Sequence, residues 1–319
     1  MKPPYQITPK ILNLISSISE KIGVVNATFL DKPSPQLRKQ NRIKTIHSSL
    51  QIEGNTLTLD QITALLENKR VIGPKKDVTE VVNAIFIYEH LENYSPKNEK
   101  SFLEAHQDLM AGLITDIGKY RNQSVGIVKG SKVAHVAPPA SNVPYLMKDL
   151  FNYLSHSDDI ALIKSCVFHY EMEFIHPFLD GNGRMGRLWQ TLLLMEKYPI
   201  FEFIPFETLI SKNQDDYYKA LAASDKSGQS TVFIEFMLDI IDSSFNDLLN
   251  YNNRTLTQKD RLDYFISLNK REFTRKDYMD IFKDISSATA SRDLKKGIEL
   301  RLFEKKGTLN NTKYYLPTS

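Results

Sequence analysis

The chain has 319 residues, 41% of them hydrophobic, and a formal net charge of +3, which is enough length and apolar content for about two to three globular domains. Its single cysteine, Cys166, excludes an intramolecular disulfide and therefore a disulfide-stabilised scaffold. No apolar run approaches the roughly 18 residues of a membrane span, and the first residues lack the apolar core of a signal peptide. We expect a cytoplasmic location.

Residues 8–53 are expected to form helices interrupted at Pro33 and Pro35. The second of these helices carries one apolar stripe, formed by Ile43, Ile46 and Leu50. Gly54 suits a C-terminal cap for that helix, and residues 58–61 have the capping-box pattern that begins the next one.

Glu53 occupies an unusual place, in the last turn of the second predicted helix. A carboxylate there faces the negative end of the helix dipole, which costs about 0.3–1 kcal/mol unless a cation offsets it. We therefore expect Glu53 to have a cationic partner outside its own helix. The alternative is an exposed glutamate beside a helix cap.

Residues 118–139 change from a helical to an alternating pattern, with valine and isoleucine on both sides of Gly130 and Pro138 after them. Alternation around a glycine predicts a β-hairpin with its turn near Gly130. Taken alone, these residues indicate an inert surface hairpin.

Residues 146–174 have a helical pattern, and four ionisable side chains in or near it could suggest a metal site: His106, His169, Glu171 and Glu173. The sequence has no His-x-x-x-His or cysteine-rich spacing to support such a site. We interpret the two histidines as hydrogen-bonded groups at or near the core.

The next twelve residues are the richest in functional groups, and they read His176-Pro177-Phe178-Leu179-Asp180-Gly181-Asn182-Gly183-Arg184-Met185-Gly186-Arg187. A Gly-Asn-Gly turn that opens into a helix presents unpaired backbone N–H groups and a positive dipole end, which favour a phosphate. Asp180 precedes this turn, and one or two carboxylates together with phosphate oxygens are typical ligands of Mg²⁺.

Three further side chains of this segment suit phosphate chemistry. Arg184 and Arg187 stand three positions apart, so both project from the same side of the first helical turn and can reach more than one phosphate. His176, just upstream, can accept a proton from an attacking hydroxyl near neutral pH.

This segment resembles the signature of the Fic family, His-x-Phe-x-Asp/Glu-Gly-Asn-Gly-Arg-x-x-Arg, and matches all eight of its fixed positions. The resemblance implies Mg²⁺-dependent transfer of AMP from ATP to a hydroxyl side chain of a protein. His176 would be the base and Asp180 the metal ligand. The phosphates would be held by Gly181, Asn182, Gly183, Arg184 and Arg187.

Residues Ser49–Gly54 resemble the inhibitory motif of the same family, Ser/Thr-x-x-x-Glu-Gly/Asn. In relatives that carry this motif ahead of the signature, called class II, the glutamate pairs with the second signature arginine and blocks productive ATP binding. We therefore expect Glu53 to pair with Arg187 and to restrain catalysis.

Two more segments have counterparts in the family. The hairpin at 118–139 resembles the flap that docks the target protein by strand addition. Residues 213–221 resemble the segment that flanks the nucleotide base, with Tyr217 and Tyr218 as its paired tyrosines; one of the two is expected to contact the base while the other packs. Asp225 departs from the asparagine expected at the base, so nucleotide selectivity is less well defined than phosphate binding.

From Tyr251 onward the chain has 15 Lys and Arg against 9 Asp and Glu, a net charge of +6. A helix at 274–282, a helical Ser286–Lys296 segment and two strands between residues 302 and 316 resemble the winged helix-turn-helix module found after Fic domains. Such a module binds either DNA in the major groove or another protein.

The predicted fold class is mainly α, a Fic-type helical bundle with a β-hairpin flap and a small C-terminal winged helix-turn-helix domain. The predicted regions are 1–95, helical with the inhibitory motif; 96–248, the catalytic core; and 257–319, the winged helix, after a linker at 250–257. We expect an autoinhibited protein adenylyltransferase that uses ATP and Mg²⁺.

Two alternatives stay open. One is a DNA-binding regulator, in which residues 257–319 bind DNA and the Fic core senses a nucleotide. The other is an enzyme that removes AMP from targets, with Glu53 orienting a water molecule. The resemblance also implies self-association, as in a homodimer.

Overall fold

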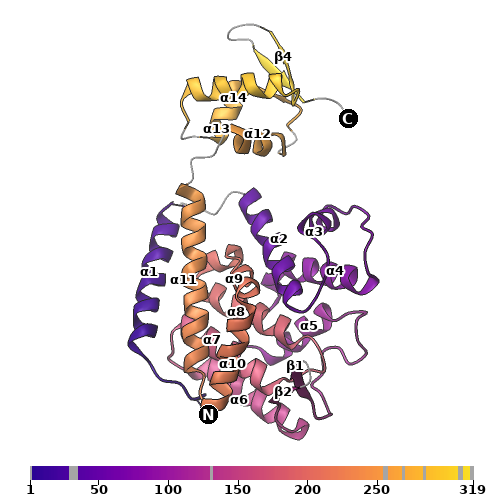
Figure 1. Cartoon of the computed structure of the whole chain (residues 1–319), viewed down its shortest axis with the longest axis vertical. Coiled ribbons are helices and arrows are strands. Elements are labelled where there is room, and N and C mark those ends of the chain that lie inside the picture. Colours follow the sequence, from indigo (N-terminus) through magenta and orange to yellow (C-terminus); the bar gives the residue numbers. More distant parts are fainter. Residues whose placement is uncertain are drawn as a thin grey trace. The chain divides into compact units, whose positions relative to one another are not determined.

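The computed structural model describes residues 2–28, 35–129, 132–253, 258–267, 270–282, 285–307 and 312–316. The chain divides into two compact units, Met1–Leu249 and Asn250–Ser319, each with its own hydrophobic core (Figure 1). Both are mainly helical, which confirms the predicted fold class. The position expected to separate the first two regions, residue 95, falls inside the first unit. Pro33 and the turn at Gly130 lie outside the described residues.

The first unit contains one β-hairpin, and its remaining elements are helical. In chain order they are α1 (Pro9–Thr28), α2 (Pro35–Ile52), α3 (Leu59–Leu66), α4 (Lys75–Glu89), η1 (Leu91–Asn93), α5 (Glu99–Leu109), β1 (Gly126–Lys129), β2 (Lys132–Val136), η2 (Ala140–Asn142), α6 (Val143–His156), α7 (Ala161–Ile175), α8 (Asn182–Lys197), η3 (Pro199–Phe203), α9 (Glu207–Lys212), α10 (Gln214–Ser227) and α11 (Thr231–Asn253).

Helices α7 and α8 pack against each other at the centre of this unit. Trp189 of α8 is fully buried, and the ring of Phe102 from α5 meets it edge-on with centroids 4.9 Å apart. Cys166 of α7 is also fully buried, and burial raises the pKa of its thiol to about 12. The two helices are therefore a rigid base for the loop between them, which carries the sequence signature.

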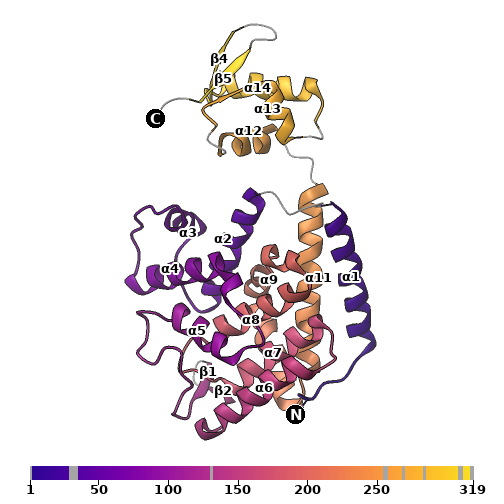
Figure 2. The same ribbon diagram turned by 180° about the vertical axis from the view of Figure 1, so that it is seen from behind.

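Helix α1 runs alongside α11, as Figures 1 and 2 show from opposite sides. Lys21 Nζ lies 2.7 Å from Asp242 Oδ2, and Thr8 Oγ1 donates a hydrogen bond to Glu235 at 2.6 Å. These contacts join the first helix of the unit to its last.

Helix α2 packs against α9 and α4, and it ends at Ile52, before the predicted end at Gly54, so Glu53 directly follows the helix. Gly54 follows with a φ of +90°, a conformation that glycine adopts without strain. The predicted capping box of α3 is present, because Thr58 accepts from the Gln61 backbone and Gln61 from that of Thr58.

Strands β1 and β2 form the predicted antiparallel hairpin. Gly126 faces Val136 and Lys129 faces Lys132, with an irregularity in the register between Ile127 and Val128. The hairpin is the only sheet of the first unit among its described residues.

The second unit combines short helices with a three-stranded sheet of order β3-β5-β4. Its elements are α12 (Gln258–Ser267), β3 (Glu272–Phe273), α13 (Arg275–Ile281), α14 (Ser287–Glu299), β4 (Glu304–Lys306) and β5 (Lys313–Tyr315). Arg261 and Asp293 form a salt bridge of 2.5 Å beside its aromatic core. The winged-helix assignment stays a prediction.

The predicted linker at 250–257 begins where the chain divides into its two units, and α11 continues into it as far as Asn253. Residues 254–257 lie outside the described residues. Among the helices that are described, none combines the length and the apolar character that crossing a bilayer requires.

Candidate active site

The signature loop begins at a strained residue. His176 caps the C-terminus of α7 with φ 49° and ψ 61°, a left-handed conformation that costs a non-glycine residue about 1–2 kcal/mol. Its carbonyl oxygen accepts a 2.7 Å hydrogen bond from Nε of Arg121, a residue 3% exposed. The buried Arg121 side chain therefore helps to hold His176 in this conformation, which turns the chain sharply from α7 into the loop.

His106 and Phe178 shape the middle of the loop. Their rings stack with centroids 3.6 Å apart, and Nε2 of His106 lies 3.0 Å from the carbonyl oxygen of Asp180. Nδ1 of His106 accepts from the backbone N–H of Gly118, so Nε2 carries the proton and donates. Burial lowers the pKa of His106 to about 4, which keeps its ring neutral. His106 is thus a hydrogen-bonded buried group, as the sequence suggested.

The helix that follows begins with the Gly-Asn-Gly turn. Gly181 is the N-cap of α8 with φ 87°, and a Cβ there would lie 2.8 Å from Sδ of Met110. The Asn182 side chain makes two 2.9 Å hydrogen bonds to the backbone of Phe178, one to its N–H and one to its carbonyl. Asn182 therefore stabilises the loop with its side chain, and it can offer an anion its backbone N–H.

Arg187 is the most deeply buried charge of the site, with 1% of its surface exposed. Its Nη2 donates to Oε1 of Glu53 at 2.7 Å and to the Ser49 carbonyl at 2.9 Å, and its Nε donates to Ser49 Oγ at 3.0 Å. Burial alone would lower the pKa of Arg187, but the Glu53 charge outweighs it and the pKa is raised. The predicted pair between Glu53 and Arg187 is present.

Arg184 differs from its expected placement. It is 4% exposed and does not line the cavity that Arg187 lines. Instead its Nη1 lies 3.2 Å from Glu80 of α4 and its Nη2 lies 2.9 Å from Asp180. The sequence spacing predicted two arginines on the same side of the helix, each able to reach a phosphate, whereas the structure turns Arg184 toward α4.

Asp180 stands at the edge of the site with a side chain 43% exposed. Its Oδ1 accepts from the Gly181 N–H at 2.6 Å and from Arg184. Among the described residues no three His, Cys, Asp or Glu side chains are grouped as a metal cage. A single accessible carboxylate beside an anion seat nevertheless fits Mg²⁺, which is often held by one or two carboxylates and phosphate oxygens.

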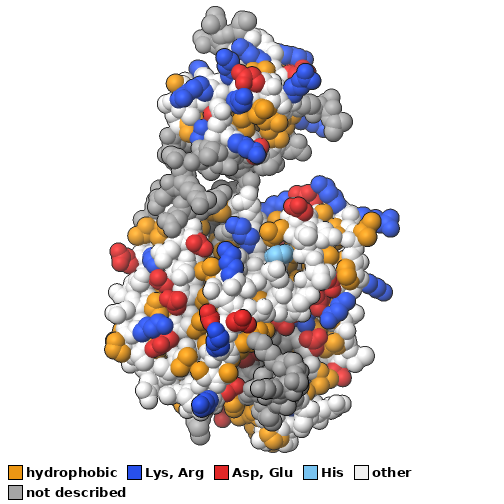
Figure 3. Space-filling model, in the orientation of Figure 1, with side chains coloured by type: hydrophobic (Ala, Val, Ile, Leu, Met, Phe, Trp, Pro, Cys, Tyr) orange, Lys and Arg blue, Asp and Glu red, His pale blue; other side chains and the backbone are white. Residues whose placement is uncertain are grey.

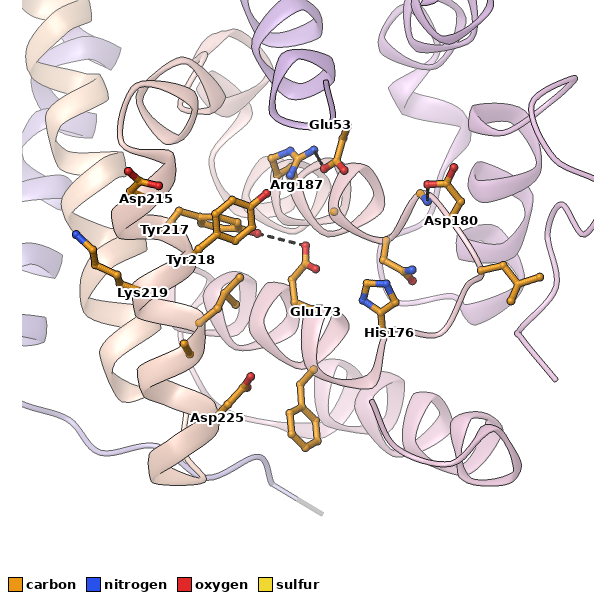
Figure 4. Close-up of a pocket in the computed structure, with 17 residues that line it drawn as sticks. Glu53, Glu173, His176, Asp180, Arg187, Asp215, Tyr217, Tyr218, Lys219 and Asp225 are labelled. Carbon is orange, nitrogen blue, oxygen red and sulfur yellow. Dashed lines mark hydrogen bonds and ion pairs between the residues drawn. The ribbon is translucent and has the colours of Figure 1, made fainter. Parts of the chain in front are cut away.

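A network that the sequence did not reveal lies between the two ends of the site. The Tyr217 hydroxyl donates to Oε1 of Glu173 at 3.2 Å and lies 3.1 Å from Nε2 of His169, whose Nδ1 is 2.6 Å from Gln190. Burial lowers the pKa of His169 to about 3, so its ring is neutral. In Figure 4, Glu173 points between the two tyrosines and His176.

His176, Asp180, Arg187 and Glu173 meet around one cavity of about 510 Å³ (Figure 4). A Cβ on Gly183 would lie 2.5 Å from Glu53 Oε1 and 3.0 Å from Arg187 Nη1, so only glycine leaves this position open. Tyr218, Asp225 and apolar side chains of α10 line another part of the cavity. The lining comprises Glu53, Glu173, Phe174, His176, Leu179, Asp180, Gly181, Asn182, Gly183, Arg187, Asp215, Tyr217, Tyr218, Lys219, Leu221, Ala222 and Asp225.

The cavity can therefore receive an elongated anion. Backbone N–H groups and Arg187 face its phosphate end, and the tyrosines of α10 offer aromatic surface to a flat ring. Tyr217 is 2% exposed and Tyr218 is half-buried, which matches the expectation that one tyrosine packs. Glu53 occupies part of the anion end in this structure.

The signature residues of this site lie within a match to a known protein family. Residues 96–194 match the model of the Fic/DOC family. The protein adenylyltransferase Fic of Drosophila persimilis is 27% identical over 221 residues, which are 66% of this chain and 41% of that protein. Its namesake in Nematostella vectensis is 27% identical over 248 residues, 72% of this chain and 55% of that protein. The chain thus spans about half the length of these curated relatives.

A solved structure matches over the whole length. The crystal structure of a Fic family protein from Desulfovibrio desulfuricans G20 is 39% identical, covers 100% of this chain and 99% of that one, and aligns with a TM-score of 0.76. This similarity extends beyond the signature to both units. The chain therefore belongs to the Fic family.

Proposed function

We propose that this protein transfers AMP from ATP to a hydroxyl side chain of a protein, and that Glu53 restrains the transfer. The observation that carries the proposal is the cavity in which His176, Asp180, the N-terminus of α8 and Arg187 lie together. The name of the curated relatives, protein adenylyltransferase, supports the same activity.

The triphosphate would lie along the start of α8. Its oxygens would accept hydrogen bonds from the N–H groups of Asn182 and Gly183, since that of Gly181 donates to Asp180, and would be favoured by the positive end of the helix. Arg187 would hold the terminal phosphate once Glu53 has left it. Arg184 would support this arrangement by fixing Asp180.

His176 would act as the general base. The attacking hydroxyl oxygen forms a bond to the α-phosphorus, while the bond from that phosphorus to the oxygen bridging the β-phosphate breaks and pyrophosphate leaves. The hydroxyl proton passes to the imidazole of His176. Asp180 would hold Mg²⁺, whose charge would offset the negative charge that develops on the phosphate oxygens.

Glu53 would restrain this reaction in two ways. Its carboxylate holds Arg187 at 2.7 Å, so the guanidinium is already paired. It also approaches the space above Gly183, where it would repel a phosphate. Glycine at position 53 would remove both effects while leaving His176 and Asp180 in place.

The target protein would add a strand to the hairpin formed by β1 and β2, within the predicted flap 118–139. Backbone hydrogen bonds would register the target with its hydroxyl toward His176, without dictating most of its side chains.

A homodimer is proposed on the family resemblance alone, and sedimentation velocity tests it.

Removal of AMP is the first alternative, because Glu53 lines the same cavity as His176 and its side chain is 31% exposed. In that reaction Glu53 would take a proton from water, and the water oxygen would bond to the phosphorus as the bond from that phosphorus to the target oxygen breaks. The target oxygen would take its proton from the protonated imidazole of His176. Release of AMP from a modified target, lost in Glu53→Gln, would favour this activity over transfer.

DNA binding by the second unit is the other alternative. Lys and Arg side chains are spread over this unit on the face shown in Figure 3. The exposed basic residues of this unit include five at the start of α13 and along α14: Arg275, Lys276, Arg292, Lys295 and Lys296. Retardation of duplex DNA that weakens with salt and is lost in Arg292→Ala would support a regulator. Binding of the full chain to a protein partner, without retardation of DNA, would instead favour a protein-docking role for this unit.

The experiment that tests the main proposal measures transfer of labelled AMP to protein hydroxyls by Glu53→Gly and by Glu53→Gly with His176→Ala. Label in the first and none in the second supports the transferase. Label in neither, with ATP still bound, would reject it.

A further inference from the structure

Arg121 stands outside the nucleotide cavity, yet it makes more hydrogen bonds to backbone carbonyls than the signature arginines do among the described residues. It lies in the segment between α5 and β1. Its side chain is almost entirely buried, with 3% of the residue exposed. A guanidinium in that position has to satisfy its donors within the protein.

Two of these hydrogen bonds reach the end of α7. Nε donates to the His176 carbonyl at 2.7 Å, and Nη2 donates to the Ile175 carbonyl at 3.2 Å. The last carbonyls of a helix have no partner within the helix, and a cation favours that end. The backbone N–H of Arg121 also donates to the Pro177 carbonyl at 2.8 Å, so three successive carbonyls around the general base are fixed by one residue.

The other two hydrogen bonds reach the two legs of the hairpin. Nη1 donates to the Gln123 carbonyl at 2.8 Å, three residues before β1 begins. Nη2 donates to the Pro138 carbonyl at 2.6 Å, two residues after β2 ends. One planar, rigid group therefore holds both legs of the hairpin and the backbone of His176 together.

From this geometry we infer that Arg121 is a positioning residue that sets the distance between the imidazole of His176 and a target strand docked on the hairpin. The inference rests on the proposed function, since it concerns the same transfer. The hydroxyl must reach both the base and the α-phosphorus, and a displacement of about 1 Å costs up to about a hundredfold in rate.

Lysine cannot replace this side chain, because an ammonium lacks the fork that reaches carbonyls on opposite sides. The nucleotide end of the cavity includes residues of α8 and α10 and Glu53, and among the described residues the hydrogen bonds of the Arg121 side chain go to none of these. A change at Arg121 should therefore affect the transfer step and the use of target, and leave nucleotide affinity unchanged.

The test compares Arg121→Lys and Arg121→Ala in the Glu53→Gly background. The matched control is Asn41→Ala, which removes another buried side chain that donates to a backbone carbonyl, that of Phe203, and neither of these residues lines the cavity. Three quantities are measured at a temperature at which all variants are folded: the Kd for ATP, the kcat and target KM for AMP transfer, and hydrogen–deuterium exchange of the full chain.

We expect Arg121→Lys to lower kcat about 10- to 100-fold and to raise target KM, with the Kd for ATP within about twofold of the parent. Exchange should increase together in peptides covering 122–138 and 174–182, whereas Asn41→Ala should leave kcat, target KM and the exchange of both peptides unchanged. A loss of nucleotide affinity equal to the loss of kcat would indicate general damage and would overturn the inference.

The exchange measurement separates this inference from the proposed function. If the Glu53→Gly parent transfers no AMP, the transferase proposal fails, and the coupling of the two segments is still decided by their exchange. If Arg121→Lys loosens only one segment, or loosens both with kcat unchanged, Arg121 does not position the base against the hairpin.

Discussion

Oε1 of Glu53 lies 2.7 Å from Nη2 of Arg187, although 134 positions separate the two residues in the sequence. The pair joins the end of α2 to the first turns of α8. Arg187 is almost fully buried, so its charge needs a counter-ion at all times, and Glu53 and a terminal phosphate are alternatives for that place. The restraint that we propose is therefore a competition between two anions.

Glu53→Gly should bind ATP more tightly, because the phosphate no longer displaces a carboxylate. We expect Kd for a non-hydrolysable ATP analogue with Mg²⁺ to fall about tenfold or more, which corresponds to at least about 1.4 kcal/mol. Isothermal titration calorimetry measures it. Glu89→Gly is the matched control, since it removes the exposed last residue of α4. An equal Kd for wild type and Glu53→Gly would contradict the competition.

Gly183→Ala should displace Glu53 without activating the protein. A methyl group there would lie 2.5 Å from Glu53 Oε1, and it would also fill the place that a phosphate needs. We expect Kd for ATP to rise about tenfold or more in a Glu53→Gly background. Gly23→Ala in α1, where a Cβ meets nothing within 4 Å, should leave Kd unchanged and raise stability by about 0.5–1 kcal/mol. Tight ATP binding by Gly183→Ala would show that the phosphate lies elsewhere.

Ionisation of Glu207 should make the free energy of unfolding depend on pH. It is fully buried at the start of α9, and burial raises its pKa from 4.5 to about 8. Between those values the unfolded chain binds fewer protons than the folded one, so the free energy of unfolding falls as pH rises from about 4.5 to 8.

Glu207→Gln keeps the shape of the protonated side chain and cannot ionise. We expect it to match wild type near pH 4.5 and to be more stable by about 1–4 kcal/mol at pH 9, as measured by urea unfolding across this range. Parallel curves for the two proteins at all pH values would mean that Glu207 ionises in the folded chain.

Asp225 should favour a base that donates hydrogen bonds. It lines the cavity, and the Tyr170 hydroxyl donates to its Oδ1 at 3.0 Å. A carboxylate only accepts, so the amino group of adenine suits it and the carbonyl of hypoxanthine does not. In the Glu53→Gly background we expect ATP to bind about tenfold tighter than ITP, a preference lost in Asp225→Ala. Asp216→Ala, outside the cavity, is the control; an unchanged preference in Asp225→Ala would remove Asp225 from base selection.

The features that could be predicted from the sequence are those with a local pattern. The capping box of α3 depends on two side chains three positions apart, and the hairpin on alternation around a turn. The pairing of Glu53 with Arg187 could be predicted for a different reason. A carboxylate at the C-terminus of a helix indicates a cation elsewhere in the fold, and the resemblance to the inhibitory motif identifies Arg187 as that cation.

The features that were missed depend on contacts between distant segments. Arg184 turns to Glu80, 104 positions earlier, and no spacing within the signature indicates that partner. The network of Tyr217, His169 and Glu173 forms because α10 packs beside α7, and its members look like ordinary helix residues in sequence. The continuation of α11 through Asn253 overrides two asparagines that favour a loop.

The most direct measurement is the intact mass of wild type, Glu53→Gly and Glu53→Gly with His176→Ala after incubation with ATP, Mg²⁺ and a hydroxyl-bearing protein, either the chain itself or a supplied target. We predict a gain of one AMP, about 329 Da, on protein incubated with Glu53→Gly, little or none with wild type, and none with the double variant. Equal gains with wild type and Glu53→Gly would contradict the restraint. An undiminished gain with the double variant would contradict His176 as the base.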